Sequence, residues 1–251
     1  MFRSIVTLAL FLRKYRIGEI HKGVVMLTSD SGLIHAIAHG ALKEKSRLRT
    51  ATEPVSHSKV YLYRDPVKDT YKVSDIEPID NFEGIRTSLV KFYVVSLWSE
   101  VVMRSFGGGT ESDNLYVLLL ECMRLLDAGQ EAEVDYVSLQ FMWRFLESTG
   151  SKPDVAHCAQ CGRFLDEAEV CYLASQSGQL YCRTCHHDEG MLLTAGARMY
   201  LQRTLAMPLT RAATVRLEGR SASALKRVLY QLVQAVLEVD LNTIRSGAGI
   251  I

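Results

Sequence analysis

The sequence has no apolar stretch that approaches the ~20 residues of a transmembrane helix. Residues 5–12 form a short apolar run, but Arg13, Lys14 and Arg16 follow it directly and no small-residue cleavage site is present. These absences argue against both a membrane span and a signal peptide. We therefore expect a cytoplasmic protein, in which the six cysteines favour metal binding over disulfides.

Signatures of the common catalytic classes are also missing. The sequence has no G-x-x-x-x-G-K-[ST] phosphate-binding loop and no Ser/His/Asp or paired-carboxylate pattern above background. His35 and His39 have the spacing of a zincin helix, but no Glu follows His35, and their alternation with Leu33 and Ile37 predicts one face of a strand. We expect a protein that is not an enzyme and that uses no ATP.

Neither sign of charge dominates, because 29 basic residues are balanced by 28 acidic ones. With 251 residues, 48% of them hydrophobic, the chain can bury one large core or two to three small ones. No internal repeat and no low-complexity linker interrupts it. The expected fold class is α+β, with a barrel over residues 1–80 and a helical domain over residues 81–251.

Short apolar runs separated by turn signals mark the first 80 residues. They predict strands at residues 5–12, 23–28, 33–39, 59–63 and 71–76, with a hairpin turn at Ser29-Asp30-Ser31-Gly32. Five short strands favour a small barrel of the OB-fold type, a Greek-key barrel used for oligonucleotides. Strand number alone leaves an SH3-like barrel open.

Helical spacing of apolar residues begins at Glu83. A first long helix is expected to end at the glycine run 107–109, a second at Gly129 and a third at Gly150, with glycine as the C-terminal cap of the last two. The face of the first is predicted to consist of Ile85, Leu89, Phe92, Leu97 and Val101. Helices resume after residue 190, and the last carries an apolar stripe of Leu225, Val228, Leu229, Leu232 and Val236.

Two CxxC pairs, Cys158/Cys161 and Cys182/Cys185, lie twenty residues apart within the segment of about residues 151–190. Four thiolates from two such turns match the tetrahedral shell of a structural Zn²⁺ ion. So short a segment cannot build its own core, whereas bound zinc contributes about 10–16 kcal/mol in comparable peptides. We predict one structural zinc ion here; free or redox-active thiols are the alternative.

Other metal-ligating residues near these pairs have simpler explanations. Cys122 lies on a predicted apolar helix face and Cys171 in a predicted hairpin strand, where free cysteine packs as a small hydrophobe. The cluster His186, His187, Asp188 and Glu189 resembles a hydrolytic metal site. Four thiolates already fill the zinc shell, however, and a catalytic zinc keeps an open position. We assign the cluster no catalysis.

A basic cluster lies in the predicted barrel. Residues 13–49 contain eight basic residues and three acidic ones. The basic residues are Arg13, Lys14, Arg16, Lys22, Lys43, Lys45, Arg47 and Arg49. Such a cluster forms an electropositive groove for a phosphate backbone, and Tyr15, Tyr61 and Tyr63 offer faces on which bases stack. A solvated basic face is the simpler alternative.

The order of parts resembles the RecO family of bacterial recombination mediators over nearly the full chain. The N-terminal similarity rests on YRIGE at residues 15–19, LTSDSG at 27–32, AHGA at 38–41 and KSR at 45–47. The helix before the cysteines is similar through Phe141, Phe145, Leu146, Gly150 and Pro153, followed by CxxCG at 158–162. The C-terminal helix ending in IRS at residues 244–246 also fits.

Two residues depart from the family pattern. His39 stands where Lys or Arg is usual, which weakens one phosphate contact at neutral pH, and Met142 replaces an expected acidic residue. Some members of the family lack the zinc cysteines. The ion is therefore expected to act as scaffold rather than in the mechanism.

The resemblance implies a nucleoid-associated DNA repair protein that binds single- and double-stranded DNA without sequence preference and anneals complementary strands. It also implies that the protein helps to load RecA onto DNA coated with single-strand-binding protein, with RecR as a partner. The acidic, apolar C-terminal tail of single-strand-binding protein is expected to bind residues 81–251, where Arg124, Arg144, Lys226 and Arg227 lie beside apolar residues. The alternative function is a zinc-ribbon module that binds protein or RNA and does not anneal strands.

Overall fold

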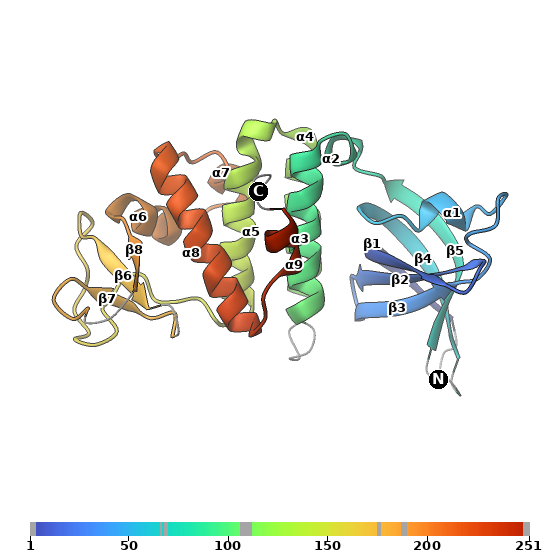
Figure 1. Ribbon diagram of the computed structural model, residues 1–251, viewed down its shortest axis with the longest axis horizontal. Coiled ribbons are helices and arrows are strands. Elements are labelled where there is room, and N and C mark those ends of the chain that lie inside the picture. The colour runs from blue at the N-terminus through green and yellow to red at the C-terminus, as the bar shows by residue number, and fades with distance from the viewer. Residues whose placement is uncertain are drawn as a thin grey trace. The chain divides into compact units, whose positions relative to one another are not determined.

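The computed structural model describes residues 4–65, 67, 70–105, 112–174, 177–186 and 190–247. Its first part is a five-stranded β-barrel (Figure 1). The strands are β1 (Ser4–Ile17), β2 (His21–Thr28), β3 (Gly32–Ala38), β4 (Ser56–Asp65) and β5 (Thr70–Asp80). All five predicted strands are confirmed. Four extend further than predicted, because extensions such as residues 13–17 carry mostly polar side chains that an apolar pattern does not mark.

The barrel closes in the order β1-β2-β3-β5-β4, with β1 pairing with both β2 and β4. β3 lies antiparallel to β2 but parallel to β5. This out-of-sequence pairing of β3 with β5 is the Greek-key connection of an OB-fold. Strand order therefore decides between the two barrel types, which strand number could not.

Alternation along the strands fills the barrel interior. Twelve buried residues form this core, which consists of Ala9, Phe11, Val24, Met26, Ile34, Ala36, Ala38, Ala41, Val60, Leu62, Val73 and Ile76. Leu10 and Leu27 are cross-strand partners that point away from the interior, yet both are fully buried. They are buried because α3 (Leu89–Ser105) and α4 (Ser112–Ala128) contact β1, β2 and β3.

The prediction of one continuous long helix from Glu83 is wrong. The structure has a short helix α2 (Glu83–Arg86) and then α3, whose first turn donates a hydrogen bond from the Lys91 N–H to the Ser88 hydroxyl. A serine at this position ends one helix and caps the next. Two residues of the predicted face, Leu89 and Phe92, are 62% and 38% exposed. The glycine run 107–109, which was expected to end the helix, lies outside the described residues.

Backbone contacts divide the chain into two compact units, residues 1–128 with 243–251, and residues 129–242. The first unit joins the barrel to α2, α3 and α4 and to a short helix α1 (Leu48–Ala51) between β3 and β4. The chain returns to this unit at Thr243 in α9 (Asn242–Ser246), whose N–H donates a 2.8 Å hydrogen bond to the Glu100 carboxylate. A domain boundary near residue 80 stays a prediction.

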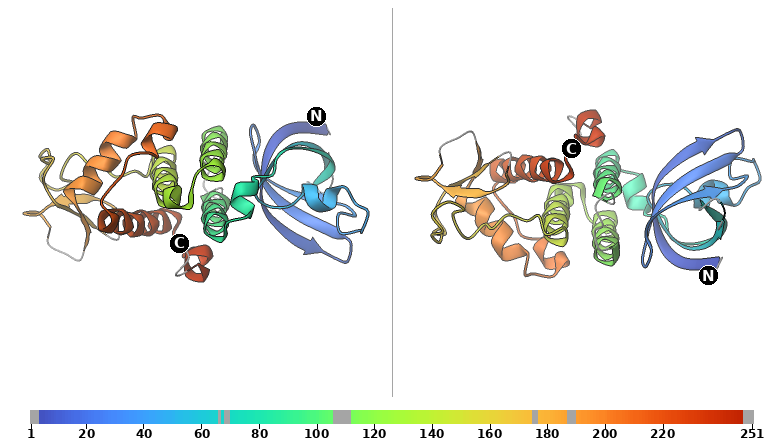
Figure 2. Two further views of the ribbon diagram at one scale, coloured as in Figure 1. Left: turned by 90° about the horizontal axis from the view of Figure 1, so that it is seen from above. Right: turned by 90° about the horizontal axis from the view of Figure 1, so that it is seen from below.

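The second unit contains the remaining elements. They are η1 (Glu131–Glu133), α5 (Val134–Ser148), β6 (Cys171–Ala174), β7 (Leu180–Cys182), β8 (Gly190–Leu193), α6 (Ala195–Thr204), α7 (Leu209–Ala212) and α8 (Gly219–Leu237). The helices predicted to end near Gly129 and Gly150 are confirmed as α4 and α5, and Gly150 has the positive φ of 67° that a C-terminal cap requires. α5 contacts α8 (Figure 2). Of the predicted α8 stripe, Leu225, Val228, Leu229 and Leu232 are buried, whereas Val236, in the last turn, is 37% exposed. Among the described residues, no helix combines the length and the apolar character needed to cross a membrane.

Candidate metal centre and nucleic-acid interface

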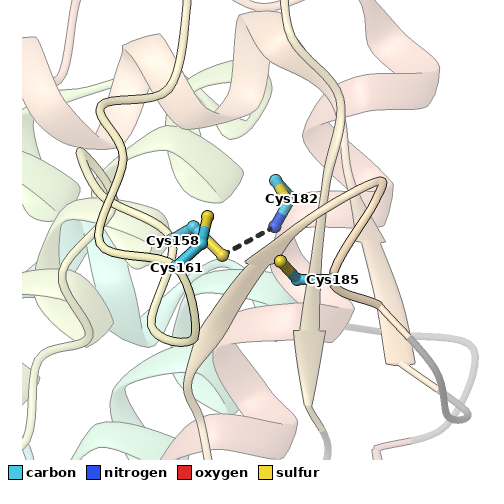
Figure 3. A group of neighbouring side chains, drawn as sticks. All are labelled: Cys158, Cys161, Cys182 and Cys185. Atoms are coloured by element: carbon cyan, nitrogen blue, oxygen red, sulfur yellow. Dashed lines mark hydrogen bonds between the residues drawn. The ribbon is translucent and has the colours of Figure 1, made fainter.

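The four cysteines of the two CxxC pairs meet at one point (Figure 3). All four sulfur atoms lie within 4.8 Å of one another. Tetrahedral coordination with metal–sulfur bonds of ~2.3 Å places sulfur atoms about 3.8 Å apart, so a small closure of this group completes the shell. Cys158 and Cys182 are buried, Cys185 is partly exposed and Cys161 is exposed.

Each pair sits in a turn fixed by backbone hydrogen bonds. In the first, the Gly162 N–H donates to the Cys158 carbonyl at 2.9 Å, and Gly162 adopts a φ of 70°, which favours glycine. In the second, the Cys185 N–H donates to the Cys182 carbonyl at 3.1 Å. A 2.8 Å bond from Ala159 N–H to the Leu180 carbonyl joins the first turn to β7. We call these two turns with the sheet β7-β6-β8 the cysteine ribbon.

The surroundings favour thiolates at two of the four positions. Burial opposes ionisation of Cys158, but N–H groups of Cys161 and Cys182 outweigh it and lower the pKa of the Cys158 thiol to about 6. One of these bonds, from Cys182 N–H to the Cys158 sulfur, is 3.4 Å long. Burial likewise opposes ionisation of Cys182, and hydrogen bonds from Cys185 lower its pKa. Thiolates are the ligand form of cysteine, so the residues fit a bound metal ion.

Cys171, Cys122 and His186 do not belong to the group of four clustered cysteines. Cys171 is the cross-strand partner of Cys182 but is fully buried, and burial raises the pKa of its thiol to about 11. Cys122 is also buried. His186 stacks on Tyr172 with ring centroids 4.0 Å apart, while His187, Asp188 and Glu189 lie outside the described residues.

Seven of the eight basic residues predicted to contact DNA are exposed. Arg13, Lys14 and Arg16 lie in the second half of β1, and the other four lie in the segment between β3 and β4. These four are Lys43, Lys45, Arg47 and Arg49. Both groups belong to the barrel, so the fold gathers the two ends of the basic stretch on one small body.

Lys22 differs from the other seven. Its side chain is only 4% exposed, and its Nζ donates to Glu53 at 3.0 Å and to the Arg49 carbonyl at 2.7 Å. Lys14 also pairs with Glu53. The two cations lower the pKa of the Glu53 carboxyl although burial opposes this. Lys22 therefore stabilises the segment before β4, and its buried ammonium group is not accessible to a phosphate.

Aromatic side chains accompany the basic ones on the outside of the barrel. Tyr15 is 42% exposed, and its ring lies against Gly23, its partner on β2, where a Cβ atom would overlap the ring. Lys59 lies 5.2 Å from the centre of the Tyr61 ring, and Lys72 lies 5.9 Å from that of Tyr63. The sequence analysis missed both lysines because they are isolated in the chain.

His39 lies at the same end of the barrel as Lys72. Its ring centroid is 4.8 Å from that of His21, and burial, His21 and Lys72 all lower the pKa of the His39 imidazole. His39 is therefore neutral near pH 7. The weaker phosphate contact expected at this position stays a prediction.

Comparisons with known proteins agree with this architecture. The family model described as Recombination protein O N terminal matches residues 1–82, and the one described as Recombination protein O C terminal matches residues 86–244. A DNA repair protein RecO of Heliobacterium modesticaldum is 32% identical over 205 residues, which are 79% of this chain and 72% of that protein. A DNA repair protein RecO of Pelotomaculum thermopropionicum is 30% identical over 237 residues, 94% of this chain and 90% of that protein. The chain belongs to the RecO family of DNA repair proteins.

Proposed function

We propose that this protein is a non-enzymatic recombination mediator, which binds single- and double-stranded DNA without sequence preference and anneals complementary strands. The observation that carries the proposal is the cluster of seven exposed basic residues on a closed OB-fold barrel. Exposed Lys and Arg neutralise phosphates irrespective of base sequence. The exposed ring of Tyr15 supplies a stacking face of the kind that single-strand-binding barrels use.

The same proposal covers partners. The protein acts with RecR to load RecA onto DNA coated with single-strand-binding protein, and it associates with the nucleoid through its DNA contacts. The acidic tail of single-strand-binding protein binds within residues 81–251. Two of the basic candidates for this contact are already engaged, since Arg144 donates to the Met207 carbonyl at 2.6 Å and Lys226 pairs with Asp135 at 2.8 Å. Of the other two, Arg124 is exposed beside the partly buried Leu125, which supports it as the tail contact, whereas the exposed Arg227 has polar neighbours on α8.

The metal ion of the cysteine ribbon is Zn²⁺, one per chain, with a structural role. Four sulfur ligands leave no open position for a substrate or a water molecule. Cys158, Cys161, Cys182 and Cys185 would hold the ion and join the turn before β6 to the end of β7. Elemental analysis of protein purified under reducing conditions tests its identity, and a chain without zinc would contradict it.

Salt-dependent binding to single-stranded DNA tests the barrel site. If about five phosphates are neutralised, the plot of log affinity against log salt has a slope near −3.5, from ~0.7 per contact. Replacement of Lys43, Lys45, Arg47 and Arg49 by Ala should flatten the slope and slow the annealing of complementary oligonucleotides. A matched control replaces Lys152, Arg203, Arg216 and Lys226, four cations of the second unit that are held in ion pairs.

The control loses the same charge and should keep most of the slope. Equal flattening in both variants would show that net charge alone matters and that the barrel holds no site. Strand annealing separates this proposal from a ribbon module that binds protein or RNA, because such a module would leave the annealing rate at that of the oligonucleotides alone.

A further inference from the structure

A second basic segment lies in the unit of residues 129–242. Residues 195–237 contain seven basic residues and one acidic residue, Glu218. The ribbon segment of residues 151–190 in the same unit is acidic, with three basic residues against six acidic ones. Positive charge in this unit is therefore concentrated in the helices that follow the ribbon.

Four of the seven cations have structural partners. Arg198 is fully buried, and its guanidinium donates to the Val155 carbonyl at 3.2 Å. Arg203 pairs with Glu167 at 2.8 Å. Arg216 pairs with Glu133 at 3.3 Å and Lys226 with Asp135 at 2.8 Å. The other three, Arg211, Arg220 and Arg227, are exposed, and no ion pair within the described residues engages them.

Two of these three arginines share one face of α8. Arg220, Ser223, Arg227 and Gln231 are spaced by three or four residues, so they follow one another along the helix, and all four are exposed. The opposite stripe, which includes Leu225 and Leu229, is buried. We call the four exposed residues the α8 arginine face. It presents two unpaired guanidinium groups and no acidic side chain.

We propose that the α8 arginine face binds the phosphate backbone of a second nucleic-acid strand. The inference rests on the proposed annealing function. Two complementary strands repel each other, so a protein that brings them together must neutralise both, and the barrel cations serve one strand. A second cationic face on the other compact unit serves the second strand, and arginine grips phosphate through paired N–H donors.

The chemistry of the face favours nucleic acid over an acidic peptide. A peptide tail with apolar residues requires an apolar pocket beside the cations. The side chains that accompany Arg220 and Arg227 on this face are Ser223 and Gln231, which are polar. Polar neighbours suit a sugar-phosphate backbone, because hydroxyl and amide groups also donate hydrogen bonds to phosphate oxygens.

The test counts short strands on the full-length protein. Titration with a fluorescent oligothymidylate too short to reach both sites should give two strands bound per wild-type chain. Arg220→Gln with Arg227→Gln should give one strand, and the barrel variant at residues 43, 45, 47 and 49 should also give one. The charge-matched control, Lys152→Gln with Arg203→Gln, should keep two. Arg220→Lys with Arg227→Lys keeps the charge and should also keep two.

Each other outcome decides against a specific claim. Two strands on the Arg220→Gln/Arg227→Gln protein, with the wild-type salt slope, overturn the second site. If the wild type binds one strand and only the barrel variant loses it, the second site is also overturned, but the proposed function stands. No strand on the wild type ends the proposed function itself. Loss of acidic-tail binding with both strands retained assigns the face to the peptide. Zinc content and thermal unfolding equal to wild type show that each variant is folded.

Discussion

The barrel and the cysteine ribbon are both small β-structures, but they are stabilised by different means. The barrel closes its hydrogen bonds around twelve buried apolar residues, so it needs no other support. The ribbon has three strands of three or four residues, and its buried face includes Cys158, Cys171 and Cys182. Five other apolar side chains are buried there, Val155, Leu165, Leu173, Leu180 and Leu193, which are too few to offset the ordering entropy of the segment. A metal ion held by the four convergent sulfur atoms would supply the missing stabilisation.

The barrel and the cysteine ribbon also differ in their balance of basic and acidic residues. The barrel carries five more basic than acidic residues between positions 13 and 49, whereas the ribbon carries three more acidic than basic ones between 151 and 190. Because buried apolar residues stabilise the barrel from inside, its outer surface is available for phosphate contacts. The ribbon segment is acidic, so its surface is poorly suited to bind DNA. The two β-structures therefore differ in surface charge as well as in how they are stabilised.

Replacement of one of the four clustered cysteines should have the largest effect on stability. Cys182→Ser removes a buried thiolate, and we expect loss of the metal and unfolding of the ribbon, because bound zinc contributes about 10–16 kcal/mol in comparable peptides. Metal content and hydrogen exchange of residues 155–193 measure this. Exchange in the barrel should stay unchanged. Cys171→Ala is the control, since Cys171 is not one of the four clustered sulfurs and should leave one metal ion per chain.

Packing of the helices that support the barrel is expected to give the next effect. A Cβ atom at Gly84 in α2 would overlap the backbone oxygen of Asp127, which cannot move without disturbing the end of α4. We expect Gly84→Ala to lower the free energy of unfolding of the first unit by about 1–3 kcal/mol. Chemical denaturation measures it. The control is Gly196→Ala in α6, where a Cβ atom meets nothing within 4 Å and helix propensity improves.

Acid should weaken the two regions for different reasons. His57 is buried and makes a 2.7 Å hydrogen bond to the Tyr116 hydroxyl, and burial with the charge of Arg124 lowers the pKa of its imidazole. The folded state thus resists protonation that the unfolded chain accepts below pH ~6.5. The unfolding free energy of the first unit is therefore complete above that pH and falls below it, by at most about 1.4 kcal/mol per pH unit.

The measurement is the free energy of unfolding between pH 5 and 8 for the wild type and His57→Gln. The variant keeps a hydrogen-bonding group but does not titrate, so its profile should be flatter. A profile as steep as that of the wild type would assign the acid sensitivity elsewhere. In the ribbon, acid instead protonates thiolates, and metal release followed with a chromogenic chelator separates the two effects.

The smallest expected effect concerns position 39. His39→Lys places a cation on the barrel where the imidazole is neutral near pH 7. One added phosphate contact should steepen the salt slope on single-stranded DNA by ~0.7. Affinity measured at several salt concentrations at pH 7.5 tests this. His35→Lys, at an exposed position of β3, the strand that ends just before His39, is the control; equal steepening in both would indicate a general charge effect.

The sequence by itself determined the elements whose signals are local. Alternation marked all five strands, and the spacing of the CxxC pairs identified the four cysteines that meet within 4.8 Å. Short-range patterns succeed here because pleat and turn geometry fix which residues share a face. The glycine at position 150 likewise marked the end of α5 through its backbone freedom alone.

Only the tertiary structure decided which surfaces are free. Lys22 appeared to belong to the basic cluster, but Glu53, thirty-one residues away, buries it in an ion pair. Leu89 and Phe92 fit the helical stripe, yet Ser88 starts a new helix and both side chains stay exposed. Arg198 and Arg220 look alike in the chain, although one is fully buried and the other exposed. Burial and charge pairing depend on residues distant in sequence, and no local pattern contains that information.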